Sequence, residues 1–568
     1  MKKSLLTISA TLLTGLAASA AGPVVMEECF PIAVSPNGEW GVNSMYAEAA
    51  IVNLKTGQQT VVEGEVYASP AVCIANNGSM VYSDYSDVSY IVINGESIKF
   101  DSSELLEYRT IILNGISADA TRVVGVYTPV QNTRGTMDRY PAMWEIDEHG
   151  KVLSVTKLPC PEKDFTGQIP QSSNALAISE DGKTILGNVI DNRGYMPQPI
   201  IYKQADDGTW AYSLPASSLI NPDGVEFPEI GEEPPYVQVT DFMGEEQKEK
   251  YQEALDEYWA EYMSGNTDAV YPDATDYLTE EELAAFEEAA NAYNTWLEEF
   301  YEILAIYDEE VMPASTVFET NAETLSPDGN FMAALSYKAV IDPADPWTEI
   351  ITYQTVSFNL ETGEISFSPE GQNFCPNQVL DGGVIIATDS TAGDGLPQIS
   401  YIRNGYDAEF VPIYDYYKET NPEVAEWIYE NFKKEFVVEN LWMGTVTEYD
   451  GIFTGETWMS KDRTVAFAGV ASIYWDEETT YTSYIINELS TGISNVAVGT
   501  GNDIKISAVR GGQINIAGDA TRVTVYDLSG RAVFSAPAAA TVATGLNGGA
   551  YIVKVDSANG SKTAKVTF

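Results

Sequence analysis

The sequence predicts an all-β fold: a β-propeller of about seven blades, with an acidic α-helical hairpin inserted in it and a C-terminal immunoglobulin-like β-sandwich. Three observations lead to this expectation. A short turn phrase recurs along most of the chain, one long gap between its copies has helical periodicity, and the composition changes abruptly near the C-terminus. The chain has 568 residues, too many for one ordinary core when a domain holds about 150 residues.

The first residues, 1–20, predict a secretory signal peptide. Lys2 and Lys3 precede a short apolar run, Leu5–Leu16, and the small residues Ala18–Ala20 form a cleavage site of the A-x-A type. The run is too short to span a bilayer stably, and no later segment is apolar enough to do so. We therefore expect an exported, soluble protein without membrane insertion.

The recurring phrase consists of an apolar residue, a Ser and a turn carrying Asp or Asn with Gly, followed by a β-rich run. Ser and Asp side chains bond nearby backbone N–H groups, and Gly accepts the positive φ of such a turn, so the phrase predicts a hairpin. Its copies are Ala33–Gly38, Ile74–Gly78, Ile116–Ala120, Ile178–Gly182, Leu325–Gly329, Leu380–Gly383 and Met459–Arg463.

A second pairing signal follows each copy, for example Met143–Asp147, so each unit is expected to form four strands, which is one propeller blade. We count seven units between about Pro23 and Val498 and assign the propeller to residues 21–498. The alternative is a set of unrelated hairpins in two or three sandwiches.

The phrase resembles the S-x-D-G repeats of TolB-like propellers. It is also similar to the Asp-box hairpin of sialidases, but every copy lacks the Thr-Trp ending of that motif. The resemblance therefore implies a propeller architecture and does not imply sialidase chemistry.

A helical insertion is expected at residues 221–316. Apolar residues follow the helical period first around Tyr251–Tyr262 and then along Leu283–Tyr307, with a capping box at Thr279–Glu282. The two helices, joined by Ser264–Leu278, should pack as an antiparallel hairpin. A third helix is expected from Asn421 to about Phe436, because Pro422 suits a first turn.

The net charge of −54 repels nucleic acid and anionic lipid, so neither is an expected partner. No Lys or Arg occurs from Tyr251 to Tyr337. Two interpretations of this acidic surface stay open: a solvated face, or a dock for a basic partner or Ca²⁺. No D-x-D-x-D-G loop is present, so we assign no metal site and no cofactor, and any Ca²⁺ would be held by scattered carboxylates.

Catalytic residues cannot be assigned from the sequence. The single histidine, His149, lies in a turn between strands and is expected to be exposed, and the G-x-S-x-G, H-E-x-x-H and phosphate-loop motifs are absent. The cysteines Cys29, Cys73, Cys160 and Cys375 form no C-x-x-C pair, so disulfides and buried thiols are both open.

The tail, residues 499–568, predicts a separate β-sandwich. From residue 500 onward it carries seven Lys and Arg against four Asp, a net charge of +3, whereas the rest of the chain is strongly acidic. Its strands alternate and are separated by turns, as in Val523–Arg531 and Leu546–Val555.

These tail motifs, with the terminal Lys565-Val566, resemble the C-terminal sorting domain, type A, of the Bacteroidetes type IX secretion system. The resemblance implies that the type IX machinery is a partner and that the protein reaches the outer-membrane surface or the medium. The residues that carry the sorting motif are Tyr526, Asp527, Gly530, Arg531, Leu546, Gly548, Gly549, Tyr551, Lys554 and Lys565.

Three functional hypotheses follow, and we favour the first. A binding or interaction propeller for a glycan, peptide or protein should show exposed aromatics in its funnel and no convergent pair of acids. A glycoside hydrolase or lyase based on carboxylates should show two or three converging carboxylates with perturbed pKa values. A purely structural surface protein should leave the apolar stripe of Leu283–Tyr307 exposed.

Overall fold

The structure, a computed structural model, describes two parts of the chain, residues 23–487 and 505–567. The expected signal peptide, residues 1–20, lies outside them. Within the two parts the description leaves out residues 28, 46–47, 63–72, 85, 131–136, 165–167, 192–196, 230, 232, 268, 316, 318, 343–344, 370–373, 390–397, 407, 441–444, 473–479, 510–512, 518–520, 527–530, 540, 547–549 and 558–559.

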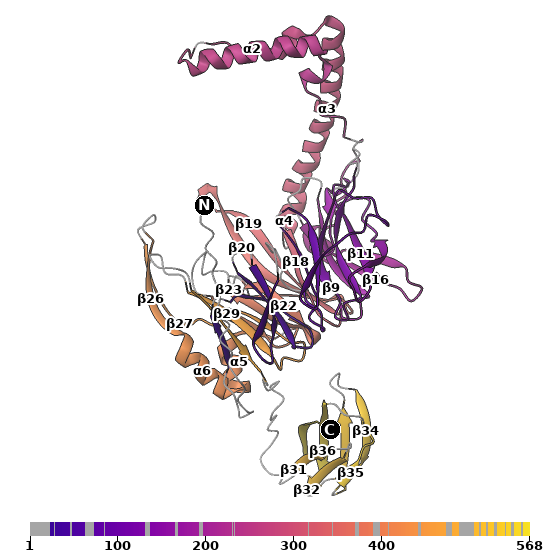
Figure 1. Ribbon diagram of the computed structural model, residues 1–568, viewed down its shortest axis with the longest axis vertical. Helices are drawn as coiled ribbons and strands as arrows, with labels where there is room; N and C mark the ends of the chain where they lie inside the picture. Colours follow the sequence, from indigo (N-terminus) through magenta and orange to yellow (C-terminus); the bar gives the residue numbers. More distant parts are fainter. Residues whose placement is uncertain are drawn as a thin grey trace.

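Seven antiparallel sheets form the propeller that the repeat predicts (Figure 1). Each sheet runs outward in chain order, so that its first strand lines the centre of the ring. The first four blades are built from β2 (Pro31–Val34), β3 (Trp40–Met45), β4 (Glu48–Asn53) and β5 (Gln58–Val62); β6 (Met80–Ser83), β7 (Ser89–Ile93) and β8 (Glu96–Lys99); β9 (Thr110–Ile116), β10 (Arg122–Thr128), β11 (Tyr140–Ile146) and β12 (Val152–Lys157); and β13 (Ser172–Ser173), β14 (Ala177–Ile178), β15 (Thr184–Ile190), β16 (Pro197–Gln204) and β17 (Trp210–Ser213).

The last blade closes the ring by pairing both ends of the propeller chain. Strand β1 (Val24–Glu27) pairs antiparallel with β30, and β28 contacts β2 of the first blade. This closure joins the last blade to the first, so that the ring leaves only short edges at the outermost strand of each blade. The fifth to seventh blades are β18 (Glu319–Leu325), β19 (Phe331–Asp342), β20 (Asp345–Asn359) and β21 (Ile365–Phe367); β22 (Phe374–Leu380), β23 (Val384–Asp389), β24 (Ser400–Arg403) and β25 (Phe410–Pro412); and β28 (Glu456–Met459), β29 (Ala466–Ser472) and β30 (Thr480–Ile486) with β1.

The recurring phrase forms the same turn in five blades. The Ser hydroxyl donates to the Asp or Asn side chain two residues later over 2.6 to 2.7 Å. The backbone N–H five residues after the Ser donates to the Ser oxygen over 2.9 to 3.1 Å. The residue three positions after the Ser has a positive φ even where it is not glycine, as at Ala120 (59°) and Arg463 (60°). This geometry explains why Ser, Asp and Gly recur together.

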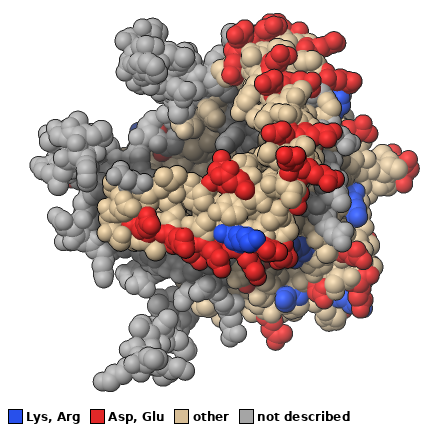
Figure 2. Space-filling model, turned by 90° about the horizontal axis from the view of Figure 1, so that it is seen from above, with Lys and Arg blue, Asp and Glu red and all other residues tan. Residues whose placement is uncertain are grey.

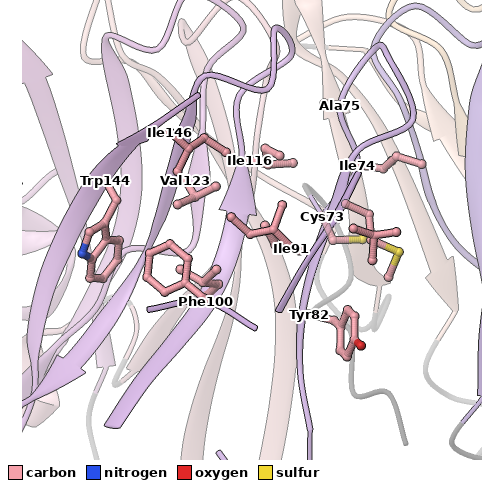
Figure 3. Close-up of a cluster of buried hydrophobic side chains, with 14 of the residues drawn as sticks. Cys73, Ile74, Ala75, Tyr82, Ile91, Phe100, Ile116, Val123, Trp144 and Ile146 are labelled. Atoms are coloured by element: carbon pink, nitrogen blue, oxygen red, sulfur yellow. The ribbon is translucent and has the colours of Figure 1, made fainter. Parts of the chain in front are cut away.

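The core lies between blades, as Figure 3 shows for the second and third. Phe100 packs edge-on against Trp144 with ring centroids 5.5 Å apart, and Trp144 Nε1 donates to Ser102 Oγ over 3.1 Å. The four cysteines are thiols rather than disulfides, and Cys29 and Cys73 are buried. Apolar contact between neighbouring sheets therefore holds the ring together.

The inserted helices form an arm that projects from the propeller between β17 and β18 (Figure 1). The capping box at Thr279 is confirmed, with its side chain and that of Glu282 each bonding the other's backbone N–H. The arm consists of α1 (Ser217–Ile220), η1 (Val239–Phe242), α2 (Glu245–Met263), η2 (Ala274–Tyr277), α3 (Glu280–Ile306), η3 (Tyr307–Val311) and α4 (Met312–Ala314).

The two long helices of the predicted hairpin are α2 and α3, joined by the segment that contains η2. Helix α2 extends crosswise from the far end of α3 (Figure 1). The apolar stripe of α3 packs instead on the segment before α2, where Phe242 meets Phe286 and Trp296 Nε1 donates to Gly231 O over 2.9 Å. Gln247 Nε2 of α2 donates to Glu282 Oε2 over 2.6 Å, so α2 contacts α3 near the start of α3.

A second insertion lies between β25 and β28 and consists of two helices and a hairpin. The expected helix from Asn421 ends earlier than predicted, because the chain turns into a strand at Lys433 rather than continuing to Phe436. Asn421 caps the helix by accepting from Val424 N, and a short helix that the sequence analysis missed precedes it. The elements are α5 (Ile413–Thr420), α6 (Pro422–Phe432), β26 (Lys433–Asn440) and β27 (Thr445–Ile452).

The tail forms a β-sandwich of a three-stranded and a four-stranded sheet. Its core is made of alternating inward residues such as Ile514, Val523 and Val553, all with no exposed surface. The strands are β31 (Lys505–Val509), β32 (Gln513–Ala517) and β35 (Thr541–Ala543) in one sheet, and β34 (Ala532–Pro537), β33 (Arg522–Tyr526), β36 (Ala550–Ser557) and β37 (Gly560–Thr567) in the other.

Candidate functional site

The central channel of the propeller has two different ends. In the five blades with a Ser-containing turn, the first strand runs from the end nearest the arm toward that turn; β18, for example, begins after the arm and ends just before Ser326. We call these the arm end and the turn end of the channel. Residues near the starts of the first strands therefore line the arm end.

The arm end opens into a cavity of about 430 Å³. Four consecutive blades, the fourth to the seventh, contribute side chains to it, and both carboxyl and carboxamide groups are among them. A few polar groups in a concave pocket are the usual composition of a small-ligand site. The cavity is lined by Asn174, Leu176, Ala177, Asn188, Asn321, Ala322, Glu323, Cys375, Pro376, Asn377, Glu456 and Trp458.

Two of these residues reach the cavity because each is the extra residue of a β-bulge. In β18 the pairing with β19 skips Glu323, and in β22 the pairing with β23 skips Asn377. A bulge re-aims one side chain without moving the rest of the strand. Bulges also occur at Ile32 and Asn114, three positions before the turn Ser as at Glu323, so the bulge is a feature of the repeat.

A chain of carboxamides fixes the carboxyl of Glu323. Asn188 N donates to Asn174 Oδ1 over 2.6 Å, and Asn188 Nδ2 donates to Asn321 Oδ1 over 2.7 Å. Asn321 Nδ2 in turn donates to Glu323 Oε1 over 2.8 Å. Each amide is oriented by the next, so the carboxyl is held in one position before any ligand arrives.

Burial raises the pKa of Glu323 to about 7, and the hydrogen bond from Asn321 only partly opposes it. Burial alone raises the pKa of Glu456 to about 7 as well. Both groups are therefore close to half protonated at neutral pH, and each can donate or accept a hydrogen bond.

Trp458 also lines the cavity, and its side chain packs in an apolar cluster with residues of the first blade. Its side chain is 3% exposed, and its indole Nε1 has no hydrogen-bond partner among the described residues. Trp458 and Glu456 alternate along β28, so both side chains lie on the same side of this strand.

The turn end of the channel is nearly filled. Its cavity measures about 30 Å³, and Glu180 of the fourth blade forms an ion pair there with Lys461 of the seventh. Burial and the negative charge of Asp328 raise the pKa of Asp381 to about 6, and the charge of Lys461 works against this rise. Of these two cavities in the described part of the channel, the one at the arm end therefore has room for a ligand of more than a few atoms.

Neither His149 nor a cluster of metal-binding side chains forms a second candidate site among the described residues. His149 lies in the turn between β11 and β12 with 81% of its side chain exposed, as expected. Throughout the described ranges, no three His, Cys, Asp or Glu side chains are grouped closely enough to hold a metal ion. No helix among the described residues is both long and apolar enough to cross a membrane.

The predicted sorting residues gather on one sheet of the sandwich. Tyr526 at the end of β33 pairs with Ile552, which pairs with Lys565 of β37, so these residues form one row across three strands. Tyr551 and Lys554 lie on β36, Arg531 just precedes β34, and Leu546 packs against the core. Asp527, Gly530, Gly548 and Gly549 lie outside the described residues.

The role of the arm-end residues in lining a cavity was not predicted from the sequence. One signal was available: a polar residue three positions before the Ser of the turn, at Asn114 and Glu323. Glu456 has no such signal, because it lies one position further from its turn and no bulge marks it.

Comparison with known proteins gives no family, since no family model matches the chain. No curated protein matches it either. Among solved structures, the putative TolB from Agrobacterium tumefaciens is 11% identical; the match covers 69% of this chain and 91% of that chain, with a TM-score of 0.28. The β-propeller domain of the trilobed protease from Pyrococcus furiosus is 10% identical, with 80% and 97% covered and a TM-score of 0.33. Neither likeness bears on function.

Proposed function

We propose that this chain is an exported propeller that binds a neutral, hydroxyl-rich ligand, such as the end of a glycan, in the cavity at the arm end. The observation that carries the proposal is that the carboxyls of Glu323 and Glu456 and the carboxamides of neighbouring asparagines line one cavity. These groups supply both donors and acceptors, which is what hydroxyl groups require.

The charge of the chain supports a neutral ligand over an anionic one. A protein with a net charge of −54 repels anions before they reach the cavity. Inside it, both carboxyls are close to half protonated near neutral pH, because burial disfavours their ionised forms. A neutral ligand can bond them without forcing a charge into the site.

Glycoside hydrolysis is the second candidate, because two carboxyls with raised pKa values share one cavity. That reaction needs one carboxyl protonated and the other ionised, and enzymes achieve this by giving the two groups different environments. Here the same cause, burial, raises both to about 7. Only Glu323 receives an opposing hydrogen bond, from Asn321, so the two environments differ in that one contact. The pair is what the hydrolase hypothesis expects, and release of product from a glycan decides between hydrolysis and binding.

Export by the type IX machinery is the second part of the proposal. It is supported by the row of Tyr526, Ile552 and Lys565 on the β33–β36–β37 sheet of a compact terminal sandwich. Removal of residues 499–568 should leave the protein in the periplasm, whereas the full chain should appear on the cell surface or in the medium. Surface appearance of the truncated chain would contradict this part.

A glycan array tests the ligand proposal. We expect the full chain to bind a subset of glycans and the variant Glu323→Gln/Glu456→Gln to lose at least about tenfold in affinity. The variant Glu148→Gln is the matched control, because the side chain of Glu148 is 88% exposed, far from the cavity. Unchanged binding by the cavity variant would reject the site, and carboxyl-dependent release of product would establish the hydrolase instead.

A further inference from the structure

Helix α2 at the end of the arm is exposed to solvent along its whole length. It has 19 residues and not one of them is buried. Isolated helices of this length are marginal in water, because most helix stability in proteins comes from packing an apolar face. Its apolar side chains do share one face, since Tyr251, Leu255, Tyr258 and Tyr262 are spaced by three or four residues.

Aromatic rings cluster at the distal end of this face. Tyr258 contacts Trp259, Tyr262 and Tyr271 at centroid distances of 5.1, 5.9 and 5.1 Å. We call these four residues the tip cluster. Three of them are well exposed: Trp259 by 50%, Tyr262 by 45% and Tyr271 by 54%. An exposed aromatic group of this kind marks an interaction surface.

The charge around the tip cluster is negative only. Glu257 and Glu261 lie on α2 within one turn of the cluster, and no Lys or Arg occurs from Tyr251 to Tyr337. The two lysines at the start of α2, Lys248 and Lys250, are each paired with a glutamate of the first turn. Figure 2, seen from above the arm, shows red acidic groups dominating this face.

We propose that the tip cluster docks a basic polypeptide segment of another protein. Aromatic faces attract Lys and Arg side chains, and carboxylates beside them select a cation over a neutral partner. A second copy of this chain is disfavoured as occupant, because it would bring two acidic surfaces together. The surface is separate from the cavity, so the proposal does not rest on the glycan ligand.

The test measures how tightly the full chain binds a peptide of alternating Arg and Gly residues. A peptide in which Glu replaces every Arg is the negative control. The informative variants are Trp259→Leu/Tyr262→Leu, which keeps apolar area and removes the π faces, and Trp259→Phe/Tyr262→Phe, which keeps them. We expect the Leu pair to weaken binding about tenfold and the Phe pair by less than about threefold.

Two further variants separate local recognition from general attraction. Glu257→Gln/Glu261→Gln should weaken binding about threefold and lessen its dependence on salt. Tyr301→Ala, an exposed tyrosine on α3 outside the tip cluster, should bind as the unmodified chain does. The proposal is overturned if the Leu pair binds normally, or if Tyr301→Ala weakens binding as much as the Leu pair.

Discussion

Glu180 and Lys461 form an ion pair that joins the fourth and seventh blades across the turn end of the channel. The backbone N–H of Lys461 also donates to Pro36 O over 3.0 Å, so this residue binds two other blades at once. The ring thus has a polar closure at its centre in addition to the apolar contacts between neighbouring sheets.

Replacing Lys461 with Met should destabilise the protein in a way that depends on pH. The lysine charge offsets the rise in the pKa of Asp381, which is about 6 in the folded protein and 3.8 when unperturbed. At about pH 5 Asp381 is largely protonated, whereas at about pH 8 it is ionised beside Glu180 and Asp328 with no counter-charge. We expect a loss about 1 kcal/mol larger at the higher pH.

Urea unfolding of Lys461→Met at both pH values checks this prediction, with the exposed Lys151→Met as control. The double variant Glu180→Gln/Lys461→Met should recover part of the loss, since it removes both charges. An equal loss of stability at the two pH values would show that the charge of Lys461 does not affect the ionisation of Asp381.

The positive φ of the turns predicts opposite effects for two substitutions. Gly329 has a φ of 72°, and a Cβ added there would lie 2.8 Å from Thr184 Oγ1, so Gly329→Ala should cost about 2 kcal/mol. Ala120 already occupies this position with a φ of 59°, so Ala120→Gly should be neutral or stabilising by up to about 1 kcal/mol. Chemical denaturation measures both changes; a stable Gly329→Ala variant would contradict the shared turn geometry.

Glu456→Gln should stabilise the protein at high pH and leave it unchanged at low pH. The pKa of Glu456 rises from 4.5 to about 7 on folding, so the folded state holds a proton that the unfolded state has lost. The contribution of this residue to stability therefore falls as pH rises from about 4.5 to about 7. We expect a gain of about 1 kcal/mol at about pH 8 and none at about pH 4. The same gain at both pH values would mean that Glu456 titrates normally.

Local patterns allowed the architecture to be predicted. Ser179 and Asp181 bond each other within one turn, and the same chemistry in each copy identifies a blade from a few residues. Thr279 and Glu282 likewise cap a helix through neighbours in sequence. The boundary at Lys433 was missed because helix α6 and strand β26 adjoin without a breaking residue between them.

The candidate site could not be predicted in this way, because it is assembled by closure of the ring. Glu323 and Glu456 come from the fifth and seventh blades, and nothing near either residue indicates the other. The bulge that turns Glu323 inward is a property of strand pairing, which the sequence of one strand does not specify. The uncovered face of α2 depends in the same way on which segment packs against α3.

Hydrogen exchange of the full chain locates the ligand without any substitution. When a glycan selected on the array is added, we expect slower exchange in β18, β22 and β28, because these first strands line the arm end of the channel. We expect no change in the terminal sandwich. Protection confined to the arm or the sandwich, with these three strands unaltered, would contradict this expectation.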